Sequence, residues 1–138
     1  MNISLTLAES IARTLSARGV KRIFGVPGGG SSLDIIDAAA RAGIEFVLCR
    51  GETAAAIMAA VTRELTGIPG VVLTGIGPGA ASVVNGVAYA SLERAPIVVI
   101  TDTHEDGAVA PPHQIFDQQA MFAPISKAQA RLDPTDGA

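Results

Sequence analysis

Two kinds of apolar pattern alternate along the chain. Short continuous runs rich in β-branched residues occupy 21–26, 44–49, 70–74 and 96–101, as is typical of parallel strands covered on both faces. Amphipathic stretches that predict helices occupy 6–19, 31–43, 52–67 and 79–94. This alternation predicts an α/β fold, a three-layer α/β/α sandwich around a doubly wound, mostly parallel sheet.

Signals at the ends of the predicted helices support their boundaries. Thr6 with Glu9 three residues later predicts a capping box, and Ser31 or Ser32 is the predicted cap of the second helix. A glycine follows each of the first three helices and predicts its end, at Gly19, Gly43 and Gly67.

The alternation loosens after Asp102. Residues 103–114 contain Pro111-Pro112 and predict a loop, 115–122 a short helix and 125–132 a last strand. The final segment, 133–138, is polar and predicts the start of an interdomain linker. We therefore expect one domain over 1–132, cut from a longer polypeptide.

The composition narrows the classes of function. Apolar residues make up 49% of the chain, which is enough for a large core. Charged residues make up only 17%, which indicates that a partner covers part of the surface. A net charge of −3 without a basic cluster argues against nucleic acid. The chain has a single cysteine, no signal peptide and no apolar stretch long enough to span a membrane. These features predict a cytoplasmic protein that is not bound to a membrane. The histidines lack ligand spacing, so no metal site is expected.

A glycine-rich turn after the third strand carries the first candidate chemistry. Gly75, Gly77 and Ala80 fit the G-x-G-x-x-G/A pattern, and Asp102 follows Ala80 by 22 positions, as in the dinucleotide fingerprint. Against this, the turn is the third of its kind instead of the first, and Pro78 removes a backbone donor. A Rossmann-type dinucleotide-binding domain is therefore one alternative, and a turn without a ligand is another.

Glu52 is the second candidate. An acid in the first turn of a helix is favoured by the helix dipole, and most such residues have no other role. This one, however, opens an alanine-rich helix with no lysine nearby, so the helix is expected to be buried, against another subunit. A carboxylate in such a setting suits the holding or sharing of a proton.

Five segments together resemble one family in order and spacing. "GVPGGG", "FVLCRGETAAAIMAA", "GVVLTGIGPGAASVVNGVA", "APIVVITD" and "MFAPISK" are similar to the N-terminal pyrimidine-binding domain of thiamine-diphosphate enzymes. The nearest resemblance is to the acetolactate synthase, benzoylformate decarboxylase and pyruvate oxidase group. The resemblance implies that the chain is part of a larger lyase or transferase that decarboxylates or ligates 2-oxo acids.

The resemblance assigns roles to individual positions. It implies that Glu52 is catalytic and bonds N1′ of the cofactor's aminopyrimidine, which promotes loss of the thiazolium C2 proton. Further cofactor-binding positions would be Gly75, Ile76, Gly77, Pro78, Gly79 and Ser82. The substrate side would be formed by Val26, Pro27, Gly28, Gly29, Gly51, His113 and Gln114. Gly51 stands where relatives usually carry histidine, Ser82 where asparagine is common, and His113 where an aromatic residue is found, which puts the specific reaction in doubt.

The resemblance also implies missing parts. Mg²⁺ would be bound through a G-D-G motif that the chain lacks, on a diphosphate-binding domain supplied in cis or in trans. The chain would then bind only the pyrimidine half of thiamine diphosphate, form a homodimer or larger assembly, and be inactive alone. Two alternatives stay open: a natural separate α subunit of a two-chain 2-oxo acid decarboxylase, and a module that has lost activity.

Overall fold

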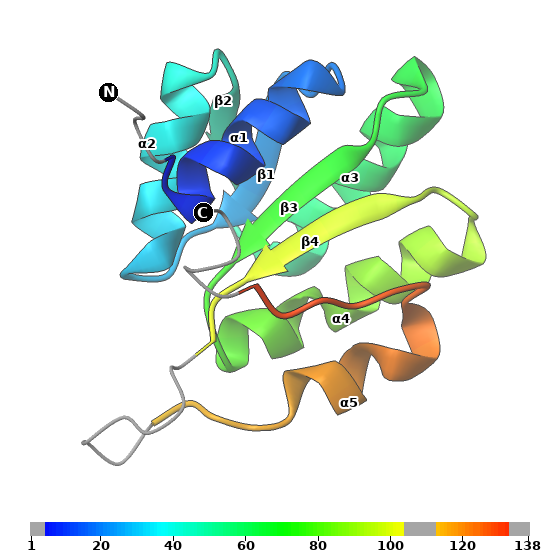
Figure 1. Cartoon of the computed structure of the whole chain (residues 1–138). Helices are drawn as coiled ribbons and strands as arrows, with labels where there is room; N and C mark the ends of the chain where they lie inside the picture. The colour runs from blue at the N-terminus through cyan, green and yellow to red at the C-terminus, as the bar shows by residue number, and fades with distance from the viewer. Residues whose placement is uncertain (1–4, 104–112, 133–138) are drawn as a thin grey trace.

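A four-stranded parallel sheet forms the centre of the molecule. The computed structural model describes residues 5–103 and 113–132. The strands are β1 (Arg22–Val26), β2 (Glu45–Leu48), β3 (Gly70–Thr74) and β4 (Ile97–Thr101), in the order β2-β1-β3-β4 (Figure 1). The chain winds outward from β1 in both directions, so the predicted doubly wound α/β fold is confirmed, with all four predicted strands within a residue of their expected bounds.

The strand register aligns one edge of the sheet. Val26 pairs with Thr74, and Thr74 pairs with Thr101, so β1, β3 and β4 end side by side. β3 is buried along its whole length because it is covered on both faces. The turns that follow these three strands are therefore brought together in space, although they are far apart in the sequence.

The first helical layer comprises α1 (Leu7–Ala17) and α2 (Ser31–Arg41), which lie on one face of the sheet (Figure 1). Ile23, Val71 and Leu73 point toward this layer and are fully buried against residues such as Ile35 and Ala39. The arrangement follows from the alternation of side chains along a strand, which directs neighbouring residues to opposite layers.

The second helical layer comprises α3 (Glu52–Thr66), α4 (Pro78–Leu92) and the short α5 (Gln118–Phe122), followed by a 3₁₀ turn, η1 (Ala123–Ile125). Phe24 and Val72 face this layer. Small residues let α3 and α4 approach closely, since a Cβ atom at Gly86 would lie 2.5 Å from Cβ of Ala56. The hydroxyl of Thr53 donates to the carbonyl of Ser82 at 2.7 Å, which fixes the first turns of α3 and α4 against each other.

Some local predictions are confirmed and two are wrong. The capping box of Thr6 and Glu9 is present, and Gly67 ends α3 in the left-handed conformation. Neither serine caps α2, because Gly30 is the N-cap and no side chain of the cap bonds the helix; both serines lie inside the first turn and bond elsewhere. The predicted last strand is absent: η1 reaches Ile125, and residues 126–132 form neither helix nor strand.

Helix α3 is only half-buried within this chain. Its inward face consists of Ala55, Ala56, Ala59 and Ala60, all fully buried. Its outer face exposes an apolar stripe, defined by Ile57, Met58, Val61 and Leu65. The expectation that this helix is covered all round is thus met on the inner face alone. Within the described residues, no helix is both long and apolar enough to cross a bilayer.

Candidate functional site

A pocket lies at the carboxyl ends of β1, β3 and β4. Its volume is about 530 Å³. Turns from three separate parts of the chain form its walls, together with the start of α3. The lining residues are Val26, Pro27, Gly28, Gly29, Gly30, Ser31, Glu52, Gly75, Ile76, Pro78, Gly79, Asp102, Thr103, His113 and Gln114. This edge is where parallel α/β sheets bind ligands.

Glu52 enters the pocket from the first turn of α3. Its side chain is half-buried and points to the start of α4, where a Cβ atom at Gly79 would lie 3.5 Å from its Oε1. The same Cβ would lie 2.8 Å from Oγ1 of Thr74, so the glycine leaves room for both side chains. A carboxylate is therefore held against a surface of backbone, in the favourable field of the α3 N-terminus.

The two glycine-rich turns touch each other across the pocket. A Cβ atom on Gly28 would lie 3.0 Å from Cα of Gly75, and one on Gly75 would lie 3.1 Å from Cα of Gly28. Side chains at these positions would force the turns apart. The result is a wall of bare backbone that a flat group can approach closely.

The turn before α4 is shaped by α5 and the residues that precede it. Gly77 has φ +61°, and a Cβ atom there would lie 2.1 Å from the carbonyl oxygen of Gln114. The backbone N–H of Gly77 donates to Oε1 of Gln118 at 3.1 Å. Gln114 itself has φ +62°, which is uncommon for a residue with a side chain and typical of functional loops.

Asp102 follows β4 and carries the second carboxylate of the pocket. Its Oδ2 accepts from the hydroxyl of Ser32 at 2.6 Å, and its Oδ1 accepts from the hydroxyl of Ser31. Ser32 is fully buried, whereas Asp102 is half-buried. The two serines predicted as helix caps therefore donate to an acid some 70 positions away.

The pocket unites most of the residues predicted from the sequence. Eleven of the fourteen predicted positions line it: Val26, Pro27, Gly28, Gly29, Glu52, Gly75, Ile76, Pro78, Gly79, His113 and Gln114. Gly77 is buried behind the turn that it shapes. Ser82 is exposed on α4, and Gly51 lies at the N-cap of α3; neither lines the pocket.

Four lining residues were not predicted as site residues: Gly30, Ser31, Asp102 and Thr103. Asp102 was considered only as the acid of a dinucleotide fingerprint. Its place directly after a buried strand is the signal that could have assigned it, because the carboxyl ends of such strands converge. The importance of Gln118 was missed as well, since nothing near it in the sequence reveals its contact with Gly77.

The charge of the pocket is negative where the structure describes it. Glu52 and Asp102 line it, and no lysine or arginine does. No group of three potential ligands among His, Cys, Asp and Glu is found within residues 5–103 and 113–132. The arrangement can therefore accept hydrogen bonds or hold a proton, and it offers a glycine-lined surface to a planar ligand.

Comparison with known proteins gives the family. Residues 5–121 match the family described as "Thiamine pyrophosphate enzyme, N-terminal TPP binding domain". The catabolic acetolactate synthase of Raoultella terrigena is 34% identical over 131 residues, which is 94% of this chain and 23% of that protein. The acetolactate synthase of Bacillus subtilis is 37% identical over 122 residues, 87% of this chain and 21% of that protein.

A third relative carries a different name. A probable 2-ketoarginine decarboxylase of Pseudomonas aeruginosa is 31% identical over 131 residues, 92% of this chain and 23% of that protein. The chain thus spans less than a quarter of the length of the curated relatives that it matches. All the residues that line the pocket fall within the matched segment, and the chain belongs to the thiamine pyrophosphate enzyme family as an N-terminal TPP-binding domain.

Proposed function

We propose that this domain binds the aminopyrimidine half of thiamine diphosphate and that Glu52 activates the cofactor. The observation that carries the proposal is the placement of one half-buried carboxylate at the wall of a glycine-lined pocket. The full enzyme would decarboxylate or ligate 2-oxo acids, as a lyase or transferase. The names of the acetolactate synthases and of the 2-ketoarginine decarboxylase support this class of reaction.

The pocket suits the proposed cofactor because it presents backbone to a flat ring and a carboxylate to the ring's edge. Bound thiamine diphosphate would supply a thiazolium carbon that stabilises negative charge during carbon–carbon bond cleavage or formation. Glu52 would hold or share a proton with a nitrogen of the pyrimidine. The turns at 27–30 and 75–79 would flank the ring and keep water away from it. His113 and Gln114, which also line the pocket, would contact the substrate.

The amides of the turn before α4 argue against the alternative of a dinucleotide site. A pyrophosphate needs several free backbone N–H groups at such a turn. Here Pro78 has none, and the N–H of Gly77 already donates to Gln118. The N–H of Gly79 lies 3.4 Å from the carbonyl of Ile76. These amides favour a turn that supports a ring by contact over one that binds a pyrophosphate.

A partner domain would complete the site. We infer that a diphosphate-binding domain, in cis or in trans, holds the diphosphate through Mg²⁺ and covers the apolar stripe of α3 in a dimer or larger assembly. Exposed apolar residues on one helix face are typical of such an interface. Leu48, 71% exposed at the end of β2, adds to the apolar surface of the chain. The chain alone would be inactive, whether it is one domain of a long polypeptide or a separate subunit.

Substitution of Glu52 tests the proposed function. Glu52→Gln keeps the size of the side chain but removes its ability to share a proton. In the intact enzyme, hydrogen–deuterium exchange at C2 of bound thiamine diphosphate is expected to slow by at least about a hundredfold, the usual contribution of a positioned acid–base group. NMR of quenched samples measures this rate.

The matched control is Glu64→Gln, the same chemical change at an exposed position of the same helix. This variant is expected to exchange at the unaltered rate. Exchange in the Glu52→Gln enzyme at that same rate would refute the role of Glu52.

A further inference from the structure

Asp102 ties the start of α2 to the end of β4. Its two carboxylate oxygens accept one hydroxyl each, from Ser31 and from Ser32. Because Ser32 is fully buried, water cannot replace this bond if Asp102 is changed. Gly28 is part of the same contact, since a Cβ atom there would lie 3.1 Å from Oδ2 of Asp102.

The local structure of α2 explains why this bond matters. The N-cap, Gly30, has φ +56° and no side chain that could cap the helix. A carboxylate near a helix N-terminus is favoured by the helix dipole. Asp102 therefore places a second carboxylate, besides that of Asp34, near the start of α2, and its bonds to both serines hold the end of the preceding turn, residues 27–30, at the pocket wall.

Gln118 links the turn at 75–79 to the end of β4 in a similar way. Its Oε1 accepts from the N–H of Gly77 at 3.1 Å, and its Nε2 donates to the carbonyl oxygen of Asp102 at 3.0 Å. Both ends of one amide are thus engaged, one by the turn before α4 and one by the end of β4. The turn at 75–79 is held at a fixed place relative to the sheet, beside Glu52.

We propose that Asp102 and Gln118 are positioning residues, each of which holds a different wall of the pocket. This proposal rests on the proposed function of the pocket. Gln118 holds the 75–79 turn and thereby sets the affinity for thiamine diphosphate. Asp102 holds the start of α2 and, through it, the 27–30 turn on the opposite wall. The division follows from their bonds: Gln118 bonds Gly77 in one glycine-rich turn, whereas Asp102 bonds the two serines that directly follow the other turn, at the start of α2.

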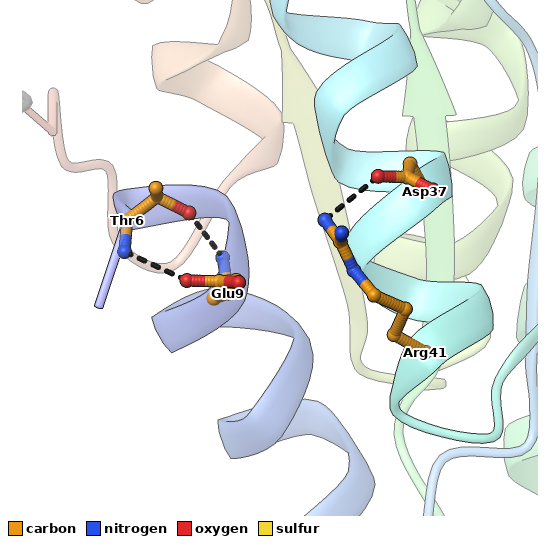
Figure 2. A network of polar contacts seen from close by, with 4 residues as sticks. All are labelled: Thr6, Glu9, Asp37 and Arg41. Carbon is orange, nitrogen blue, oxygen red and sulfur yellow. Dashed lines mark hydrogen bonds and ion pairs between the residues drawn. The ribbon is translucent and has the colours of Figure 1, made fainter. Parts of the chain in front are cut away.

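Two nearly isosteric substitutions separate these duties in the intact protein. Gln118→Met removes the acceptor for Gly77 and the donor to Asp102, whereas Asp102→Asn keeps the shape and removes the charge. Asp37→Asn is the matched control, because Asp37 lies on α2 in an exposed ion pair with Arg41, at 2.7 Å (Figure 2). Amide hydrogen exchange by mass spectrometry follows segments 26–34 and 73–80, and calorimetric titration with thiamine diphosphate and Mg²⁺ measures the cofactor Kd.

The expected result is a reciprocal pattern. Gln118→Met should raise exchange in 73–80 and raise the cofactor Kd roughly tenfold, the effect of losing a hydrogen bond in a part-buried site. Asp102→Asn should raise exchange in 26–34 roughly tenfold and leave exchange in 73–80 unchanged. Asp37→Asn should change neither. Exchange in α1 serves as the measure of global folding in each variant.

Other results would overturn the inference in distinct ways. If both variants raised the Kd equally and raised exchange throughout the protein, including α1, the cause would be general destabilisation and not the loss of separate contacts. A Gln118→Met protein with unchanged Kd would refute the role of Gln118, and an unchanged segment 26–34 in Asp102→Asn would refute that of Asp102. An unaltered protein that binds no thiamine diphosphate would refute the proposed function, while the exchange data would still decide whether each residue holds its own turn.

Discussion

At the scale of single residues, two glycines beside the pocket differ in what the fold requires of them. Gly77 has φ +61° and contacts the carbonyl oxygen of Gln114, so a side chain there would be strained and would clash. Gly51 has φ −175° and ψ 153°, which any residue adopts, and a Cβ atom there would meet nothing within 4 Å. Neither the backbone conformation nor the packing thus requires a glycine at position 51, where the family resemblance leads us to expect a histidine.

The same substitution at both positions tests this contrast. Gly77→Ser is expected to lower the free energy of unfolding by about 3 kcal/mol, from backbone strain and overpacking. Gly51→Ser should raise it by a few tenths of a kcal/mol, because a serine oxygen at the N-cap of α3 can accept a backbone N–H. Urea unfolding measures both values. Equal losses in the two variants would contradict the assignment.

The sequence revealed the pocket residues that a local pattern marks, and it concealed those that are marked only by contacts with distant residues. Glu52 could be identified because its helix start, its apolar neighbours and its place after a strand are all visible in one short segment. Asp102 and the serines could not, since their contact joins positions about 70 residues apart. The local pattern predicted that a serine oxygen would accept from a backbone N–H as a cap, whereas in the folded chain both serine hydroxyls donate to the Asp102 carboxylate.

At the scale of elements, the capping box at the start of α1 is a local device with a measurable contribution. Oγ1 of Thr6 accepts from the N–H of Glu9 at 3.2 Å, and the N–H of Thr6 donates to Oε2 of Glu9 at 3.0 Å (Figure 2). Thr6→Ala removes the acceptor for one of the free N–H groups of the helix. We expect the free energy of unfolding to fall by about 1 kcal/mol in urea titrations. An unchanged value would show that α1 does not depend on its cap.

Glu9 makes the stability of the same helix depend on pH. The backbone N–H of Thr6 lowers the pKa of the Glu9 carboxyl, with a smaller contribution from the Thr6 hydroxyl. The contribution of Glu9 to stability is therefore complete above the pKa of the unfolded chain and is lost as pH falls through the lower pKa of the folded state. Glu9→Gln should flatten the decline of stability between about pH 6 and pH 3. A slope identical to that of the unaltered chain would contradict the assignment.

The elements themselves were predictable wherever burial imposes a pattern. β3 is covered on both faces, and its continuous apolar run identified it; the helices were identified by their amphipathic spacing and end signals. The segment 125–132 alternates in a way that favours a strand, but a strand exists only through hydrogen bonds to a neighbour. No ladder partner is assigned to it in the described residues, and its spacing alone could not show this. The predicted linker at 133–138 lies outside the described residues.

At the scale of the whole molecule, the apolar stripe of α3 stands out because nothing in this chain covers it among the described residues. Leu65 is 81% exposed, and Ile57, Met58 and Val61 lie on the same face at helical spacing. On the opposite face the small alanine side chains let α3 pack closely against the sheet, in contact with Phe24 and Val72. The helix therefore presents Glu52 at one end and an open apolar surface along its length, which is consistent with a site that a second domain completes.

Charged substitutions on the stripe separate assembly from folding. In the intact protein, Ile57→Lys combined with Val61→Lys should leave the domain folded, because both side chains are more than a third exposed in this chain and a lysine can extend its charged end into water from such positions. The same change should dissociate the assembly and abolish cofactor retention, because two lysines would have to be buried without partners. Sedimentation velocity gives the mass, and calorimetry gives the bound thiamine diphosphate. Leu33→Lys is the control, an exposed leucine on α2, across the sheet from the stripe. If the double variant kept both its mass and its cofactor, the stripe would not be the surface that the second domain covers.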